Sequence, residues 1–215
     1  MKPRQDRRSR EYMMKQQKTT QRDLRPLTSI HIAPYMQVAT ALIGKAREGG
    51  GNMFRHQVDT MSVLIDYGYI DSILLKAALI HDVIEDIDDF NVNDILSIDS
   101  EAGQVYNLVL EVTKKKGQKK PDYLKGIIKH GSEKAKILKC ADRISNMVSL
   151  GFVNEPEFIE RYCDETEVYV FPIALAVNFN MYEELLHLVM SRRKYLSDSG
   201  YLLRDTKCEH ADSFR

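Results

Sequence analysis

The sequence predicts an all-α fold built as a single domain. Along most of the chain, apolar residues recur at the three- and four-residue spacing of amphipathic helices. No segment alternates apolar and polar residues as a half-buried strand would. At 215 residues the chain is long enough to bury one sizeable core without disulfides or other cross-links. Together these observations favour a helical bundle.

The predicted helices follow one another along the chain. The glycines at residues 49–51 end the first helix, because glycine readily leaves the helical conformation. Asp71 or Ser72 can cap the third helix, and Ser132 can cap a later, longer one. Pro172 should kink the helix that contains it. The helices are expected at residues 33–47, 55–65, 71–89, 92–98, 101–113, 121–129, 132–150, 156–176 and 180–196.

Composition divides the chain into three parts. Residues 1–28 carry many basic and few apolar side chains, which predicts a mobile arm that solubilises the protein or touches nucleic acid or an acidic partner surface. Residues 29–198 hold the helical domain. Residues 199–215 are expected to form a loose polar tail. The oligomeric state stays open.

Charge and cysteine content narrow the class of protein. Lys and Arg together number 31, as do Asp and Glu, so the net charge is zero, which argues against general binding to nucleic acid or membranes. Three widely spaced cysteines indicate unpaired thiols in a reducing compartment. No apolar run approaches the roughly 20 residues of a transmembrane helix, and the N-terminus lacks the apolar core of a secretory signal. We therefore expect a cytoplasmic, soluble protein.

The predicted helix at residues 71–89 changes polarity within one turn. Its first half is apolar, and its second half brings one histidine and five acidic residues together. Acidic residues near a helix C-terminus face the negative end of the helix dipole, which costs from a few tenths to about 1 kcal/mol each. A bound divalent cation would reverse the sign of that penalty. The sequence therefore predicts a metal site on this helix.

Four residues are candidate metal ligands. His81 and Asp82 are adjacent and can reach one ion at the edge of the helix. His56 and Asp142 lie on other helices that should pack against this one. Read singly, His56 could be a packed histidine, and Asp142 could pair with Arg143 or a nearby lysine. Imidazole and carboxylate ligands together suit Mn²⁺, Fe²⁺ or Zn²⁺.

Three further features surround this predicted site. Glu85 and Asp86 lie one turn beyond the predicted ligands, where they could orient or deprotonate a metal-bound water. Small polar side chains form a stripe along the helix at residues 132–150, which suggests a pocket wall. This stripe comprises Asp142, Ser145, Asn146 and Ser149. The basic segment at residues 114–120 is either a solvated turn or an aid in holding an anionic substrate.

At this point the sequence resembles a known family, the HD phosphohydrolases. More narrowly, HDVIED at residues 81–86, EVTK at 111–114 and KCADRISNM at 139–147 resemble the hydrolase domain of RelA/SpoT-type alarmone enzymes in order and spacing. Downstream, the segment from Glu165 to Pro172 is similar to that family's ETxxxYxP motif. The resemblance covers roughly residues 36–180.

The resemblance implies an HD-domain helical bundle with one Mn²⁺ held by His56, His81, Asp82 and Asp142, with Fe²⁺, Zn²⁺ or Mg²⁺ as alternatives. Glu85 and Asp86 would be catalytic and would activate the attacking water. The family removes the 3′-pyrophosphate of ppGpp or pppGpp, the alarmones of the stringent response, and yields GDP or GTP. The chain would be a stand-alone hydrolase of this guanosine nucleotide. The residues expected to contact the substrate are Arg47, Arg55, Asn146, Ser149 and Tyr169.

Three positions depart from the family pattern. Glu48 stands where a second basic residue is usual, Gln57 where a proline follows the first ligand histidine, and Ser145 where a histidine precedes Asn146. Glu48 should weaken binding of a polyanion. Two alternatives therefore stay open. One is an HD hydrolase of another phosphorylated nucleotide, such as a nicotinamide dinucleotide phosphate or a nucleoside monophosphate. The other is a non-catalytic nucleotide-sensing module.

Overall fold

The computed structural model describes residues 25–47 and 51–201. These residues form helices joined by short connections, and the described part contains no named strand. The all-α prediction is confirmed. The chain separates into two compact units, residues 1–30 and 31–215. In the first unit, the described residues form a short 3-10 helix, η1 (Arg25–Ser29). Most of the predicted arm, up to residue 24, and the predicted tail from residue 202 fall outside the described residues.

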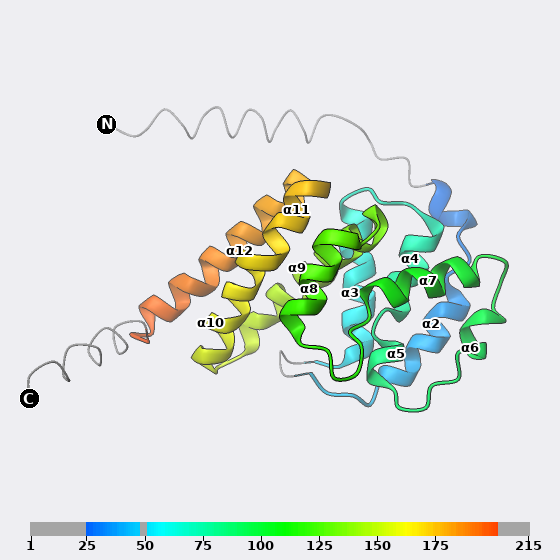
Figure 1. The fold of residues 1–215 in the computed structure, drawn as a ribbon, viewed down its shortest axis with the longest axis horizontal. Helices are drawn as coiled ribbons and strands as arrows, with labels where there is room; N and C mark the ends of the chain where they lie inside the picture. Colours follow the sequence, from blue (N-terminus) through cyan, green and yellow to red (C-terminus); the bar gives the residue numbers. More distant parts are fainter. Residues whose placement is uncertain (1–24, 48–50, 202–215) are drawn as a thin grey trace, which may run out of the picture. The chain divides into compact units, whose positions relative to one another are not determined.

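The second unit holds the helices labelled in Figure 1. In chain order they are α2 (Ala33–Ala39), η2 (Thr40–Leu42), α3 (Met53–Asp66), α4 (Ser72–Ile80), α5 (Val83–Asp86), α6 (Asn93–Leu96), α7 (Ala102–Val112), α8 (Lys120–His130), α9 (Glu133–Ser149), η3 (Leu150–Phe152), α10 (Pro156–Glu165), the π-helical η4 (Thr166–Val170), α11 (Phe171–Val177) and α12 (Phe179–Asp198).

Side chains cap the helices that position the site. The Asn52 side chain accepts a hydrogen bond from the Arg55 backbone N–H at 2.9 Å and starts α3. Asp71 does the same for α4, through Leu74 N–H at 2.9 Å. The predicted cap at Ser132 is confirmed, since its hydroxyl accepts from Ala135 N–H. Each cap satisfies a backbone N–H that the first turn of a helix leaves without a partner.

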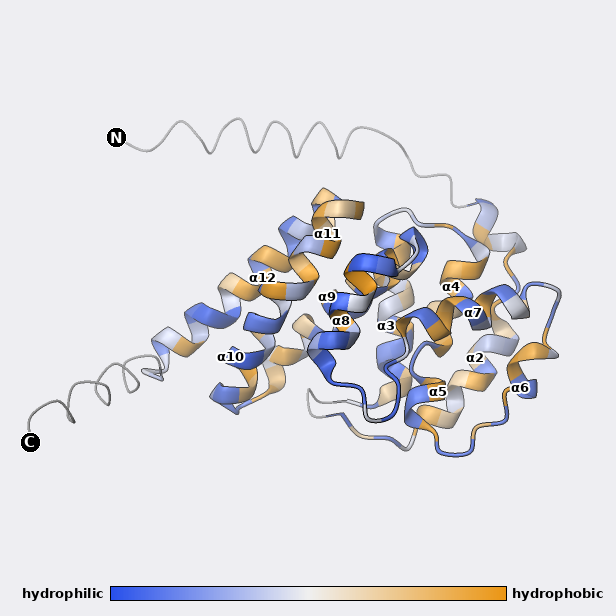
Figure 2. Cartoon of the chain, viewed as in Figure 1, coloured by the Kyte–Doolittle hydropathy of each residue, from blue (hydrophilic) through white to orange (hydrophobic). Residues whose placement is uncertain are grey.

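The core lies around α4 and α9. α4 is largely apolar, as Figure 2 shows, and every residue from Leu74 to Ile80 is buried. α9 packs against α3 and α4 on one side and against α11 and α12 on the other (Figure 1). α3, which carries His56 near its start, and α4, which ends just before His81, are therefore held against α9, which carries Asp142. In the described part of the chain, no helix combines the length and the apolar character needed to cross a membrane.

Three predicted helices are interrupted. The first ends at Leu42 instead of residue 47. The helix expected at 71–89 is broken at His81 and Asp82, which separate α4 from α5. The helix expected at 156–176 passes through η4, just before Pro172. Proline lacks an N–H and its ring crowds the carbonyl four residues earlier, which accounts for the displaced hydrogen bonding there.

A buried lysine links α4 to the segment between α6 and α7. Lys76 is 3% exposed, and its ammonium group lies 2.8 Å from Asp99 Oδ2 and 2.5 Å from Glu101 Oε2. Tyr35 donates a hydrogen bond to the other Asp99 oxygen at 3.0 Å. Burial alone would lower the pKa of Lys76, but the two carboxylates outweigh it and raise the pKa. This network fixes one edge of the core.

Replacing Lys76 with Met should lower the free energy of unfolding by about 2–3 kcal/mol, since two carboxylates lose their counter-ion. Their side chains are 20% and 36% exposed, so the loss should fall short of the ~3–5 kcal/mol typical of fully buried pairs. Urea denaturation measures it. The matched control is Lys134→Met, which breaks a half-exposed pair with Asp71 and should cost less than about 1 kcal/mol. Equal losses in both variants would contradict the structural role of Lys76.

Candidate active site

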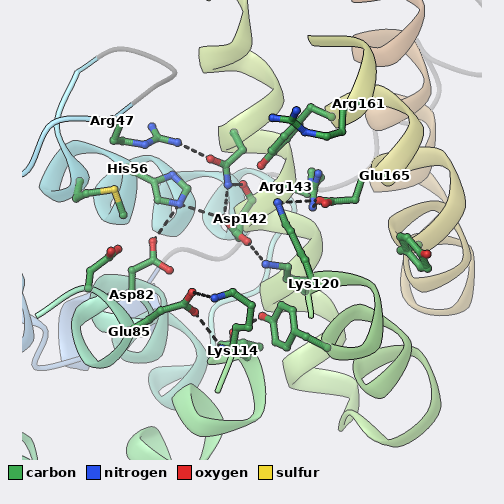
Figure 3. A pocket seen from close by; sticks show the side chains of 18 of the residues that line it. Arg47, His56, Asp82, Glu85, Lys114, Lys120, Asp142, Arg143, Arg161 and Glu165 are labelled. Carbon is green, nitrogen blue, oxygen red and sulfur yellow. Dashed lines mark hydrogen bonds and ion pairs between the residues drawn. The ribbon is translucent and has the colours of Figure 1, made fainter. Parts of the chain in front are cut away.

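A cavity of about 970 Å³ opens beside α9. Its lining comes from the segment after η2, from α3, the α4–α5 junction, α5, α8, α9, α10 and η4, and from the end of α7 and the segment after it. Figure 3 shows His56, Asp82, Glu85 and Asp142 on one side, with Arg143, Arg161 and Glu165 on the other. The cavity thus has a candidate metal end and a cationic end.

The structure brings together the four candidate metal ligands. One ligand atom each from His56, His81 and Asp82 lie within 4.8 Å of one another. Asp82 Oδ2 is 3.3 Å from His81 Nε2 and 3.5 Å from His56 Nε2. Asp142 Oδ1 is 3.0 Å and 3.8 Å from His56 Nε2 and His81 Nε2, respectively. Side chains of α3 and the α4–α5 junction therefore form one cluster, and Asp142 of α9 lies beside both of its imidazoles.

His81 is held in the orientation that a metal ligand needs. Its Nδ1 lies 2.8 Å from the Ala78 carbonyl oxygen, which can only accept, so Nδ1 carries a hydrogen. In its neutral form, which binding of a metal would require, the ring presents the Nε2 lone pair to the cluster; without a metal, the nearby carboxylates of Asp82 and Asp142 favour the protonated ring. Nε2 is buried and makes no hydrogen bond to the described residues, although Asp82 Oδ2 lies 3.3 Å away. A buried imidazole nitrogen left open beside carboxylates fits a divalent cation.

His56 and Asp142 are held by their own partners. His56 Nδ1 lies 2.9 Å from Ser145 Oγ, so that Nε2 faces the cluster. Asp142 divides its two oxygens. Oδ2 accepts from Lys139 at 2.6 Å, whereas Oδ1 faces the imidazoles and also accepts from Asn146 Nδ2. Burial alone would raise the pKa of Asp142, but Lys139 and His56 outweigh it and hold the pKa well below its usual range. Asp142 thus stays ionised.

The charge on His81 makes the stability of the metal-free protein depend on pH. Burial alone would lower the pKa of His81, but the carboxylates of Asp82 and Asp142 outweigh it and raise the pKa from 6.5 to about 9. A raised pKa stabilises the fold below pH 6.5, and this contribution is lost as the pH rises through 9.

We expect the free energy of unfolding of the metal-free protein to fall by up to about 3 kcal/mol between pH 6.5 and pH 9.5, at about 1.4 kcal/mol for each pKa unit. Denaturant titrations in the presence of a chelator measure this change. In His81→Ala the slope over this range should be largely absent. A wild-type stability that rises with pH here would contradict the assignment.

The two acidic residues predicted to be catalytic line the cavity, each with a lysine beside it. Glu85 Oε1 lies 3.1 Å from Lys114 Nζ, and Glu85 Oε2 accepts from the Lys114 backbone N–H at 3.0 Å. Asp86 accepts from Lys45 Nζ at 2.8 Å. α5 begins after the break at residues 81–82. The two ion pairs connect it to the segments that follow η2 and α7. The sequence reading missed both pairings.

The cationic end of the cavity rests on an ion-pair cluster. Arg143 is buried and pairs with Glu165, and its guanidinium carbon lies 4.2 Å from the centre of the Tyr162 ring. Lys120 Nζ is 3.1 Å from the same Glu165 carboxylate. Arg161 lines the cavity alongside them. The local excess of positive charge suits an anionic ligand. Of the basic segment at 114–120, Lys120 lies at this end of the cavity. Nothing in the sequence indicated that this segment lies near α10.

The residues predicted to contact the substrate fall into three groups. Arg47, Asn146 and Tyr169 line the cavity. Ser149 is not part of the lining but supports Arg47, which donates hydrogen bonds to Ser149 Oγ at 3.3 Å and to Asn146 Oδ1. Arg55 is not part of the cavity lining; its side chain is 72% exposed and faces Asp59 at 3.5 Å. Glu48 falls outside the described residues.

Comparisons with known proteins bear on the fold. No protein-family model matches the chain, and no curated protein matches it. Among solved structures, the chain is similar to a metazoan ortholog of SpoT that hydrolyses ppGpp and plays a role in starvation responses. The sequence identity is 25% and the TM-score is 0.62, and the match covers 74% of this chain and 96% of the ortholog. The resemblance read from the sequence motifs is thus confirmed: the chain has the helical HD-type fold of a SpoT-like ppGpp hydrolase.

Proposed function

We propose that the chain is a metal-dependent hydrolase that removes the 3′-pyrophosphate of ppGpp and pppGpp. The observation that carries this proposal is the open, buried Nε2 of His81, which faces two carboxylates and a second imidazole. His56, Asp82 and Asp142 line one end of the cavity, whereas His81 is not part of the lining. The likeness to a SpoT ortholog that hydrolyses ppGpp supports the substrate class.

His56, His81, Asp82 and Asp142 would hold the metal. Their mixed nitrogen and oxygen ligands suit Mn²⁺, Fe²⁺ or Zn²⁺, and Mn²⁺ is the first candidate because the family resemblance implies it. When bound, a divalent cation supplies Lewis-acid polarisation and acidifies water. The supporting partners Ala78, Ser145 and Lys139 keep three of these side chains oriented toward the cluster. Such outer partners are a regular part of metal sites.

Glu85 and Asp86 are the proposed acid–base residues. In the proposed reaction a water oxygen bonds to the phosphorus attached to the 3′ oxygen, and the bond between that phosphorus and the 3′ oxygen breaks. The water proton passes to the acidic pair, and the 3′ oxygen leaves as a hydroxyl after taking up a proton. Lys45 and Lys114 would hold both carboxylates in place.

The rest of the cavity would bind the nucleotide. Arg161 and Lys120 at the cationic end suit its phosphates. Arg47, whose guanidinium edge is held by Asn146 and Ser149, would offer a planar face to the guanine base by cation–π contact. Tyr169 would line the same pocket.

A product assay with chelator-treated protein tests the proposal. ppGpp, a nicotinamide dinucleotide phosphate and a nucleoside monophosphate are each incubated with and without Mn²⁺, and pyrophosphate, phosphate and GDP are measured. We expect pyrophosphate and GDP from ppGpp when Mn²⁺ is present, and little turnover otherwise. Full turnover without metal would overturn the metal dependence. Turnover confined to another nucleotide would overturn the substrate, and saturable nucleotide binding without turnover would support a sensing module in its place.

A further inference from the structure

Gln57 is a buried amide whose two ends both face Asp82. It follows His56 on α3 and is fully buried, at 0% exposure. Its Nε2 donates a hydrogen bond to Asp82 Oδ2 at 2.9 Å. Its Oε1 faces the Asp82 backbone N–H at 3.5 Å, a long and therefore weak contact. Residues 25 positions apart are thus joined at the cluster.

The orientation of this amide is fixed by chemistry. An ionised carboxylate can only accept, so the side of the amide that faces Asp82 Oδ2 must be the NH₂ group. A buried amide without a partner would cost about 1–3 kcal/mol. The hydrogen bond to Asp82 therefore avoids this cost for the Gln57 amide. It also gives the Asp82 carboxylate a donor that a proline at position 57 would not provide.

The bonded oxygen is the one that faces the cluster. Asp82 Oδ2, which accepts from Gln57, is also the atom 3.3 Å and 3.5 Å from the two imidazole Nε2 atoms. The Asp82 side chain is 24% exposed, so it has room to turn toward solvent. The Gln57 hydrogen bond opposes that rotation and leaves a second lone pair of Oδ2 directed at the cluster.

The other three candidate ligands each have a partner of this kind. His81 is held by the Ala78 carbonyl, His56 by Ser145, and Asp142 by Lys139. We propose that Gln57 completes this set as a positioning residue that holds the Asp82 carboxylate in its metal-binding orientation. The inference rests on the metal site of the proposed function.

Mn²⁺ binding to the chelator-treated, full-length protein tests the inference. The variant is Gln57→Met, which keeps the length of the side chain and removes both polar ends. We expect the dissociation constant for Mn²⁺ to rise by about 10- to 100-fold, as is typical when an outer partner of a ligand is lost. The electron paramagnetic resonance spectrum of bound Mn²⁺ should also change. The melting temperature of the metal-free protein should stay close to that of the wild type.

Two further variants keep the test decisive. Gln57→Asn takes the place of Gln57→Met if the latter does not fold. It retains an amide but is one methylene too short to reach Asp82, so it should also weaken Mn²⁺ binding. Thr60→Val changes another fully buried polar residue of α3, whose hydroxyl has no partner among the described residues. It should bind Mn²⁺ as the wild type does.

The outcomes separate this inference from the proposed function. If both Gln57 variants bind Mn²⁺ within twofold of the wild type with an unchanged spectrum, whereas His81→Ala does not bind, the role of Gln57 is refuted and the metal site stands. If the metal-free melting temperature falls and the Mn²⁺ affinity does not, Gln57 is structural only. If the wild type binds no Mn²⁺, the proposed metal site fails and the inference fails with it.

Discussion

A His81→Ala variant should release pyrophosphate from ppGpp at least about 10³-fold more slowly than the wild type. Polarisation by a bound metal is worth several kcal/mol in the transition state, and every 1.4 kcal/mol is a factor of ten in rate. His81 is 4% exposed, and its Nε2 has no hydrogen-bond partner in the described part of the chain, so its removal leaves the remaining candidate ligands with a gap where the metal would sit. The measurement is turnover of ppGpp at saturating Mn²⁺, together with Mn²⁺ affinity.

The matched control for this variant is His130→Ala. His130 is an exposed histidine in the last turn of α8 and is not part of the cavity lining. It should keep wild-type turnover and wild-type affinity for Mn²⁺. Equal losses in the two variants would indicate a general effect of losing a histidine, and unchanged turnover in His81→Ala would remove His81 from the metal site.

The double variant Glu85→Gln and Asp86→Asn should lower kcat by about 10²- to 10⁴-fold, the usual contribution of a general acid or base. Both substitutions keep the shape of the side chains and remove their charge. Lys114 and Lys45 would keep hydrogen-bonding acceptors in these amides, so α5 should stay in place. Affinity for Mn²⁺ should change little, because neither residue belongs to the converging ligand set.

The control for the acid pair comes from the segment that follows it. Asp88 and Asp89 lie two and three residues beyond Asp86, and neither lines the cavity. The variant Asp88→Asn and Asp89→Asn removes the same amount of charge and should leave kcat unchanged. A loss of kcat of similar size in both double variants would show that net charge near α5, and not proton transfer by Glu85 and Asp86, governs the rate.

The helices were the part of the molecule that the sequence predicted well. Periodicity and local caps, such as Ser132 at the start of α9, depend on residues within one or two turns, so they can be read from the chain directly. The breaks were predicted poorly. Residues 81–82 keep nearly helical backbone angles, and at this break their side chains contact Gln57 of α3 and Asp142 of α9. Local propensity carries no information on such contacts.

The candidate site was predicted in its acidic and histidine residues but not in their surroundings. Motif spacing indicated that His56, His81, Asp82 and Asp142 share a site. The lysines beside Glu85 and Asp86 were missed, because these pairs join residues 29 and 41 positions apart and lysine is common on any surface. Gln57 was noted as a departure from the family pattern, and its hydrogen bond to Asp82 becomes visible only when α3 packs beside the α4–α5 junction.

The central claim is that side chains from α3, the α4–α5 junction and α9 bind one divalent cation. Anomalous diffraction at the manganese absorption edge, from crystals of the chelator-treated protein soaked with Mn²⁺, tests it most directly. We expect one strong peak within about 2.3 Å of an imidazole nitrogen of His56 and of His81, with Asp82 and Asp142 completing the protein ligands. A peak elsewhere, or no peak at a Mn²⁺ concentration that supports turnover, would contradict the claim.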